Sequence, residues 1–167
     1  QCSISILWFA WFGFNAASTV AASVSIGRIA LNTHLAACAA ASTYMILALL
    51  QSKAVLMRHT INASLAGLVA ITAGCATMSP PFAIITGAIA GFLITFVPQF
   101  IEKMQLDDVV DAVTVHGVCG AWGTLAAGIF FEKALFNLLS NAFKFTPENG
   151  NIFVRLKYES MKVSLEI

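Results

Sequence analysis

Three side chains in the segment WFGFNAAS, residues 11–18, could together bind a small cation. Trp11, Phe14 and Ser18 are spaced at i, i+3 and i+7, so a helix places them within about 60° of one another. Aromatic faces attract cations by about 0.5–2 kcal/mol, and a hydroxyl oxygen accepts a hydrogen bond from one. Helix packing is the alternative, and it is the stronger interpretation for this face alone, because aromatic stripes usually lie in a core.

A histidine and three carboxylates occupy the segment DDVVDAVTVHGVCGAWG, residues 107–123. Ionisable groups inside membranes are costly and tend to line pathways, and the neutral imidazole of His116 can both donate and accept a proton. A satisfied core histidine is the alternative, and both interpretations stay open. Asp107 and Asp108 suit a polar helix start, which the helix dipole favours. Asp111, one turn later, suits a functional role better.

The composition is that of a membrane protein. Hydrophobic residues make up 59% of the chain, charged residues 10%, and the mean hydropathy is +0.84. Soluble domains have about 45–50% apolar and about 25% charged residues. The net charge of +1 gives no basic field, so no nucleic acid partner is expected. The four cysteines stand apart within apolar segments, which indicates buried thiols.

Several apolar segments are long enough to cross a bilayer, which takes roughly 20 helical residues. Small residues are dense in them, as in residues 87–91 and at Gly117, Gly120 and Gly123, and this spacing lets helix backbones approach closely in lipid. Pro98 is expected to end the fourth span. Five spans are predicted, at about residues 4–26, 29–50, 61–79, 82–98 and 109–131.

Basic residues in the connections predict the orientation of these spans. Arg28 lies in the first connection, Lys53 and Arg58 lie in the second, and Lys103 lies in the fourth. The second and fourth connections are therefore expected to be cytoplasmic. Five crossings then place the residues after Phe131 on the outer side.

The composition changes after Phe131, where residues 132–167 hold five of the nine basic residues. Leucines at helical spacing are followed by the turn residues 146–150 and then by alternating apolar and polar residues. A second module, a short and incomplete α/β unit, is predicted there.

The segment WFGFNAAS resembles the WFGFNAGS of the ammonium transporter family, with Ala17 where glycine is usual. Residues 107–124 resemble that family's DDxxDxxxVHGVxGxxG signature, and NTHLAACAAA and LAGLVAITAG resemble two further segments of it. The match covers residues 4 to about 130, which implies helices six to ten of an eleven-helix fold. The family's first five helices, which supply the partner histidine, have no counterpart in this sequence.

The resemblance implies ammonium or ammonia as the substrate, a lipid bilayer as the environment and a homotrimer as the assembly. It assigns Ser18 to the outer ammonium site, Phe14 to a gating ring and Trp11 to the pore lining. His116 matches the second of two paired pore histidines, and Asp111 matches an acidic position near the inner mouth. His34 and His59 match no functional position and are given no role.

The segment NLLSNAFKFTPENG, residues 137–150, resembles the N-box of sensor histidine kinases, which implies ATP and Mg²⁺ as cofactors of a parent kinase. By that resemblance Asn141 ligates Mg²⁺, while Asn137 and Lys144 face the nucleotide phosphates. The kinase family's phosphoacceptor histidine and adenine-binding loop have no counterpart here, so no catalytic residue is assigned.

The expected fold is mainly α, with a transmembrane bundle over residues 1–131 and a partial kinase ATP-binding domain over residues 132–167. The first hypothesis is a truncated or internally deleted ammonium sensor of a bacterial inner membrane. Its parent couples a transporter-like domain to a histidine kinase and a response regulator. The alternatives are an ammonium channel fragment joined accidentally to kinase sequence, and a histidine kinase on its own. Because Gln1 follows no initiator Met, the start is expected to be cut. These 167 residues are expected neither to conduct nor to transfer phosphate.

Overall fold

The computed structural model describes residues 2–20 and 25–130. The chain divides into two units, Gln1–Phe130 and Phe131–Ile167, and the described residues all belong to the first. The predicted α/β module at residues 132–167 lies outside the described part. The described elements are α1 (Cys2–Ala17), α2 (Ser25–Leu50), α3 (Met57–Thr72), α4 (Pro80–Lys103), the π-helix η1 (Val113–Val118) and α5 (Cys119–Ile129).

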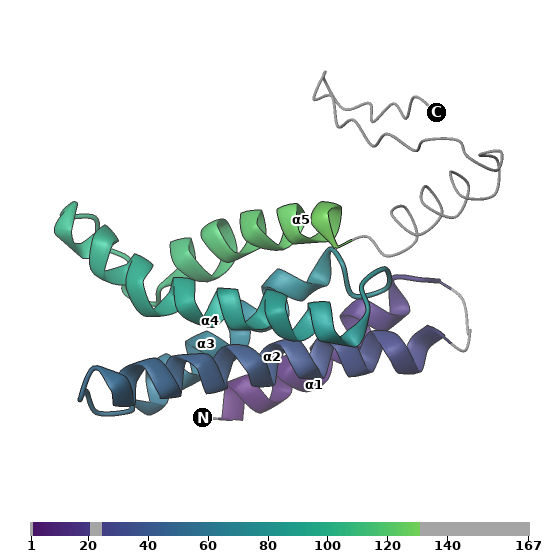
Figure 1. Ribbon diagram of the computed structural model, residues 1–167, viewed down its shortest axis with the longest axis horizontal. Helices are drawn as coiled ribbons and strands as arrows, with labels where there is room; N and C mark the ends of the chain where they lie inside the picture. The colour runs from purple at the N-terminus through teal and green to yellow at the C-terminus, as the bar shows by residue number, and fades with distance from the viewer. Residues whose placement is uncertain (1, 21–24, 131–167) are drawn as a thin grey trace, which may run out of the picture. The chain divides into compact units, whose positions relative to one another are not determined.

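The helices lie side by side, and successive helices run in opposite directions (Figure 1). α2 packs on both α3 and α4, while α1 packs on α2 and α3, and α5 packs on α3 and α4. The connections 51–56 and 104–112 therefore lie at the same end of the bundle. Lys53, Arg58 and Lys103 all belong to this end, whereas Arg28 lies at the start of α2, at the opposite end.

Small residues line the contacts between helices. A Cβ atom added to Gly87 would collide with the backbone of Ala36, and one added to Gly123 would collide with the backbone of Ala70. Only glycine permits these two approaches, so the predicted close packing is confirmed at both crossings. Gly117 differs, because nothing lies within 4 Å of the position that its Cβ would take.

The third helix is shorter at its C-terminal end than predicted. α3 ends at Thr72, and residues 73–79 form turns instead of continuing the span. The amide of Asn32 donates to the carbonyls of Cys75 and Met78, both at 2.9 Å, and the Arg28 guanidinium donates to the Met78 carbonyl at 2.9 Å. These bonds from α2 hold the connection in a non-helical path, and apolar composition alone does not reveal them.

The prediction that Pro98 ends the fourth span is wrong. α4 continues through Pro98 to Lys103. Proline removes one donor from the helical ladder, and buried or membrane helices tolerate this where other groups compensate. The side-chain amide of the neighbouring Gln99 donates to the Thr95 carbonyl at 2.7 Å within the same turn.

The first and fifth predicted spans are also too long. α1 ends at Ala17, and the hydroxyls of Ser18 and Thr19 then bond back to the carbonyls of Phe14 and Ala16. The last helical stretch begins only after Asp111, whose φ of 56° is left-handed and interrupts a helix. Local polar bonds and backbone conformation thus set these ends.

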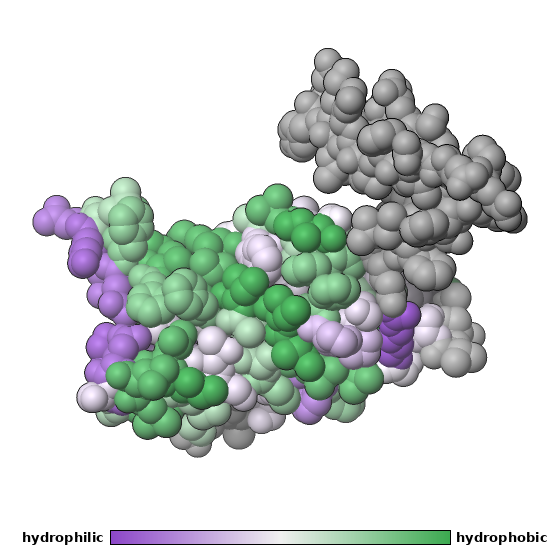
Figure 2. Space-filling model, in the orientation of Figure 1, coloured by the Kyte–Doolittle hydropathy of each residue, from purple (hydrophilic) through white to green (hydrophobic). Residues whose placement is uncertain are grey.

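Two helices, α2 and α4, are long and apolar enough to cross a membrane by length and composition alone. α1 and the η1–α5 stretch are shorter apolar helices. Figure 2 shows hydrophobic residues covering the middle of the visible face, while hydrophilic residues gather toward its ends. Each of the five predicted spans contains a helix in the described part of the chain, and two of these helices, α2 and α4, reach the length of a single crossing.

Candidate functional site

α1 presents two of the predicted cation-binding residues on one face. The rings of Trp11 and Phe14 are in contact, with centroids 5.8 Å apart and planes inclined by 57°. Ser18 lies just past the helix end and donates its hydroxyl proton to the Phe14 carbonyl. The Trp11 indole donates to the Thr72 hydroxyl at 2.9 Å. Packing therefore explains Trp11, whereas Phe14 is 60% exposed and is not a core residue of the described unit.

His116 lies in the π-helical stretch η1, just before α5. π-Helical turns are rare and occur frequently at functional sites. The His116 side chain is exposed, and within residues 2–20 and 25–130 it has no hydrogen-bond partner. The interpretation of His116 as a satisfied core histidine does not fit this environment. Its assigned role in a pore stays a prediction.

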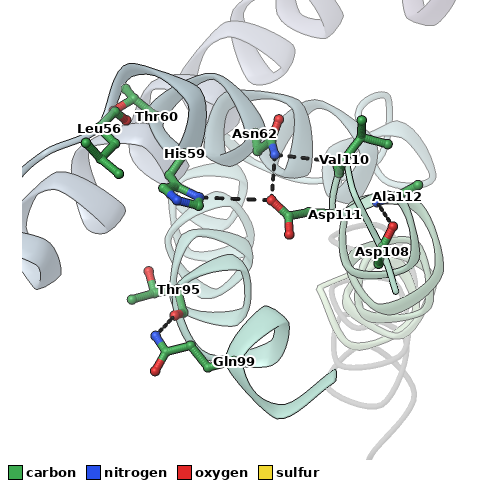
Figure 3. A network of polar contacts seen from close by, with 10 residues as sticks. All are labelled: Leu56, His59, Thr60, Asn62, Thr95, Gln99, Asp108, Val110, Asp111 and Ala112. Carbon is green, nitrogen blue, oxygen red and sulfur yellow. Dashed lines mark hydrogen bonds and ion pairs between the residues drawn. The ribbon is translucent and has the colours of Figure 1, made fainter. Parts of the chain in front are cut away.

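Asp108 and Asp111 have different environments although they lie one turn apart. The Asp108 carboxylate accepts hydrogen bonds from the backbone N–H groups of Ala112 and Val113, both at 2.8 Å. Asp108 therefore caps the start of the last helical stretch, as a polar helix start predicts. Asp111 is buried, with 8% of its surface exposed, and it points toward α3 (Figure 3).

Asp111 is the centre of a polar network with two residues of α3 (Figure 3). The Asn62 amide donates to Asp111 Oδ2 at 2.8 Å and to the Val110 carbonyl at 3.4 Å. His59 Nδ1 lies 4.0 Å from the same Asp111 oxygen, and its ring centroid is 6.0 Å from that of Tyr44. His59 was assigned no role from the sequence, yet the fold places it beside Asp111 near the end of the bundle.

Only part of this polar network could be predicted from the sequence. His59 and Asn62 are three residues apart, so a helix presents both on one face. No pattern in the sequence links that face to Asp111, which lies about 50 positions further along the chain.

Two buried asparagines, Asn15 and Asn32, make polar contacts that were not predicted from the sequence. Asn15 is 3% exposed, and its amide donates to the Thr33 hydroxyl at 2.9 Å, which joins α1 to α2. Asn32 is fully buried and binds the connection after α3. Asn15 and Asn32 both interrupt apolar segments, and a buried amide needs hydrogen-bond partners. The sequence therefore indicates that each makes a polar contact, but it does not show with which residue.

The predicted pore residues form two separate groups in the described unit. Trp11, Phe14 and Ser18 belong to α1 and its end, whereas His116 belongs to η1, and α1 makes no close backbone contact with η1 or α5. Asp111 lies with His59 at one end. The predicted nucleotide and Mg²⁺ residues Asn137, Asn141 and Lys144 lie outside the described residues. Within the described ranges, no group of three His, Cys, Asp or Glu side chains could hold a metal ion.

Known proteins with similar sequences are ammonium transporters. The sequence model described as the Ammonium Transporter Family matches residues 4–161. The ammonium transporter Amt2 of Archaeoglobus fulgidus is 49% identical over 128 residues, which are 76% of this chain and 27% of that protein. A putative ammonium transporter of Synechocystis, sll0537, is 41% identical over 130 residues, 78% of this chain and 24% of that protein.

Solved structures share the fold of the described unit. A protein titled Sensor Amt Protein superposes with a TM-score of 0.76 at 42% identity, over 78% of this chain and 33% of that one. Mep2 of Saccharomyces cerevisiae superposes with a TM-score of 0.73 at 26% identity, over 79% of this chain and 30% of that one.

The chain spans about a quarter of the length of these curated relatives. The family match continues to residue 161 and so includes most of the segment predicted to be a kinase fragment. Neither the curated relatives nor the solved structures support that kinase assignment, which stays a prediction. Over the greater part of its length, this chain belongs to the ammonium transporter family.

Proposed function

We propose that the outward faces of α1 and η1 line one side of an ammonium pathway in a longer membrane protein. The observation that supports this most strongly is His116, an exposed imidazole without a described partner in an otherwise apolar helical stretch. An ionisable side chain in such a helix is expensive in a membrane unless it faces a pathway or a partner.

The α1 face supplies the groups that attract an ammonium ion. The Ser18 hydroxyl donates its proton to the Phe14 carbonyl, so its oxygen keeps lone pairs that can accept an N–H from the ion. The neighbouring rings of Trp11 and Phe14 offer π faces, which are worth about 0.5–2 kcal/mol to a cation depending on its desolvation.

His116 supplies the group that handles a proton. A neutral imidazole accepts a proton at one ring nitrogen and donates from the other, which suits passage of ammonia together with a proton. Potassium has no N–H to donate and no proton to lose, so this chemistry rejects it. Asp111, two residues before the start of η1, adds a carboxylate that attracts a cation there.

A chimera tests this proposal in an intact transporter. Residues 4–130 replace the matching segment of Amt2 from Archaeoglobus fulgidus, and uptake of radioactive methylammonium is measured in cells without their own ammonium transporters. The chimera is expected to transport, and Phe14→Ala should lower its uptake several-fold because a cation-binding face is lost.

Phe9→Ala is the matched control, because Phe9 is a second exposed ring on α1, at 80% exposure. Phe9 is five residues from Phe14 and lies on a different part of the helix surface. Equal losses in the two variants, or an inactive chimera that reaches the membrane in normal amounts, would contradict the proposed pathway.

Ammonium sensing is the second function that we propose, because a solved protein named as a sensor is 42% identical to this chain. The proposal extends to a parent in a bacterial inner membrane that assembles as a homotrimer and acts through a histidine kinase and a response regulator. Sequencing of the genomic DNA and the transcript across Phe131 and Glu132 tests it. The sensor proposal predicts a phosphoacceptor histidine and an adenine-binding loop in one message, and a message without them would refute the kinase link.

A further inference from the structure

A pocket with both charged and apolar residues in its lining lies at the end of the bundle where α2 ends, α3 begins and α4 ends. Its volume is about 490 Å³, within the range of about 300–1,000 Å³ typical of small-molecule sites. Of the residues assigned a role in ammonium passage, only Asp111 lines it. The pocket is therefore distinct from the aromatic face of α1 and from His116.

Charges of opposite sign line different walls of this pocket. Lys53 lies in the α2–α3 connection and Arg58 lies in the first turn of α3, whereas Glu102 lies in the last turn of α4. Among the described residues, none of these three has an ion-pair partner. Asp111 is already bound to Asn62 and close to His59. Two cationic groups and one carboxylate thus remain available to a ligand.

The uncharged part of the lining adds a donor and a backbone acceptor. The side-chain nitrogen of Gln51 is buried and has no hydrogen-bond partner among the described atoms. A buried amide donor left unpaired is unfavourable, and a ligand acceptor would remove that cost. On α4, Pro98 lacks the N–H that would otherwise bond to the Ile94 carbonyl one turn earlier. Both Ile94 and Pro98 line the pocket.

We propose that this pocket binds a free α-amino acid. The carboxylate is held by Arg58 and Lys53, and the Gln51 amide completes its hydrogen bonds. The α-ammonium is held by Glu102 and the Ile94 carbonyl. The neutral polar side chains of Tyr44 and Gln99, which also line the pocket, suit a ligand side chain with an amide.

A zwitterion fits this lining better than a simple ion does. A ligand with only an anionic group leaves Glu102 unpaired and close to a like charge, and one with only a cationic group does the same to Arg58 and Lys53. Arg pairs with a carboxylate through two parallel hydrogen bonds, which gives geometric selectivity as well as affinity. The ligand must therefore present both groups on one carbon framework.

The test is calorimetric titration of the full chain in phosphatidylcholine nanodiscs, with L-glutamine as the probe. Two analogues each lack one charged group: glutaramate lacks the ammonium and 4-aminobutanamide lacks the carboxylate. We expect L-glutamine to bind at least about tenfold more tightly than either analogue, which corresponds to about 1.4 kcal/mol. Equal binding of the three compounds, or no binding of L-glutamine, overturns the proposal.

Two variants and a matched control locate the site. Arg58→Gln and Glu102→Gln should each weaken L-glutamine binding by at least about tenfold. Lys103→Gln removes a charge beside Glu102 that does not line the pocket, so it should leave the affinity unchanged. All three residues are exposed, so the melting temperature should hardly change in any variant. Unchanged binding in both pocket variants would overturn the assignment.

A phosphatidylethanolamine headgroup is also a zwitterion and could reach the same pocket. Repeating the titration in nanodiscs that contain phosphatidylethanolamine distinguishes a free amino acid from the lipid headgroup as the occupant. The amino-acid proposal predicts the same affinity in both lipids, whereas loss of L-glutamine binding in the second would identify the lipid headgroup as the occupant and overturn it.

Discussion

The interior between α2, α3 and α4 and the outward faces of α1 and η1 are built from opposite kinds of residue. In the interior, glycine and alanine bring backbones together, and the amide nitrogens of the buried Asn15 and Asn32 donate hydrogen bonds between segments. On the outward faces, Phe14 and His116 are exposed, and among the described residues the His116 imidazole has no hydrogen-bond partner. Stability is therefore concentrated in the first region, and the groups suited to cation chemistry are concentrated in the second.

Gly87→Ala should produce the largest loss of stability, because the added methyl group collides with the backbone of Ala36. Overpacking of this kind costs about 1–3 kcal/mol. Thermal unfolding in detergent measures the effect. Gly128→Ala is the control, because nothing lies within 4 Å of its Cβ position and the gain in helix propensity is about 1 kcal/mol. Equal melting temperatures for the two variants would show that the crossing is not tight.

Asn32→Leu should have the next largest effect. The change removes both 2.9 Å bonds to the α3–α4 connection and leaves two buried carbonyls without this donor, at a cost of about 1–3 kcal/mol. Hydrogen exchange should rise in residues 73–79 before the rest of the chain. Leu31→Ala, at an exposed neighbouring position, is the control and should leave that exchange unchanged.

Asp108→Ala should lower the free energy of unfolding by about 1 kcal/mol, the usual value of an N-terminal helix cap. The two lost bonds hold the first turn before His116, so exchange of the Ala112 and Val113 amides should also rise. Asp107→Ala removes a neighbouring exposed carboxylate that accepts no hydrogen bond among the described residues, and it should have little effect. A similar loss in both variants would favour a general charge effect over capping.

Phe14→Ala should have the smallest effect on stability, within about 0.5 kcal/mol, because an exposed ring contributes little to folding. The same change should lower methylammonium uptake by the chimera. A large loss of stability would show that Phe14 is a packing residue, and it would contradict the distinction between the interior and the outward faces.

Much of the helical organisation could be predicted from the sequence, because apolar segments of membrane length are a strong signal. Their ends could not be predicted, because they depend on contacts between distant residues. Residues 73–79 leave the helix where Asn32 and Arg28 bind their carbonyls. Pro98 was expected to stop a helix that the surrounding packing allows to continue.

The candidate site was predictable where one helix holds all its members. The spacing of Trp11 and Phe14 led directly to the observed ring contact. His59 and Asp111 were beyond prediction as a pair, because the left-handed backbone at Asp111 and its place beside α3 are tertiary features. The expected roles of Asn137, Asn141 and Lys144 belong to residues outside the described part.

The most direct test of the proposed pathway is methylammonium uptake by the Amt2 chimera with His116→Ala, compared with Leu125→Ala. Leu125 is an exposed residue of α5 nine positions further along, which a helix turns to the opposite side. We expect uptake or its selectivity against potassium to fall at least about tenfold in His116→Ala, while Leu125→Ala stays near the unchanged chimera. Unaltered uptake and selectivity in His116→Ala, at equal amounts in the membrane, would contradict a pathway lined by the η1 face.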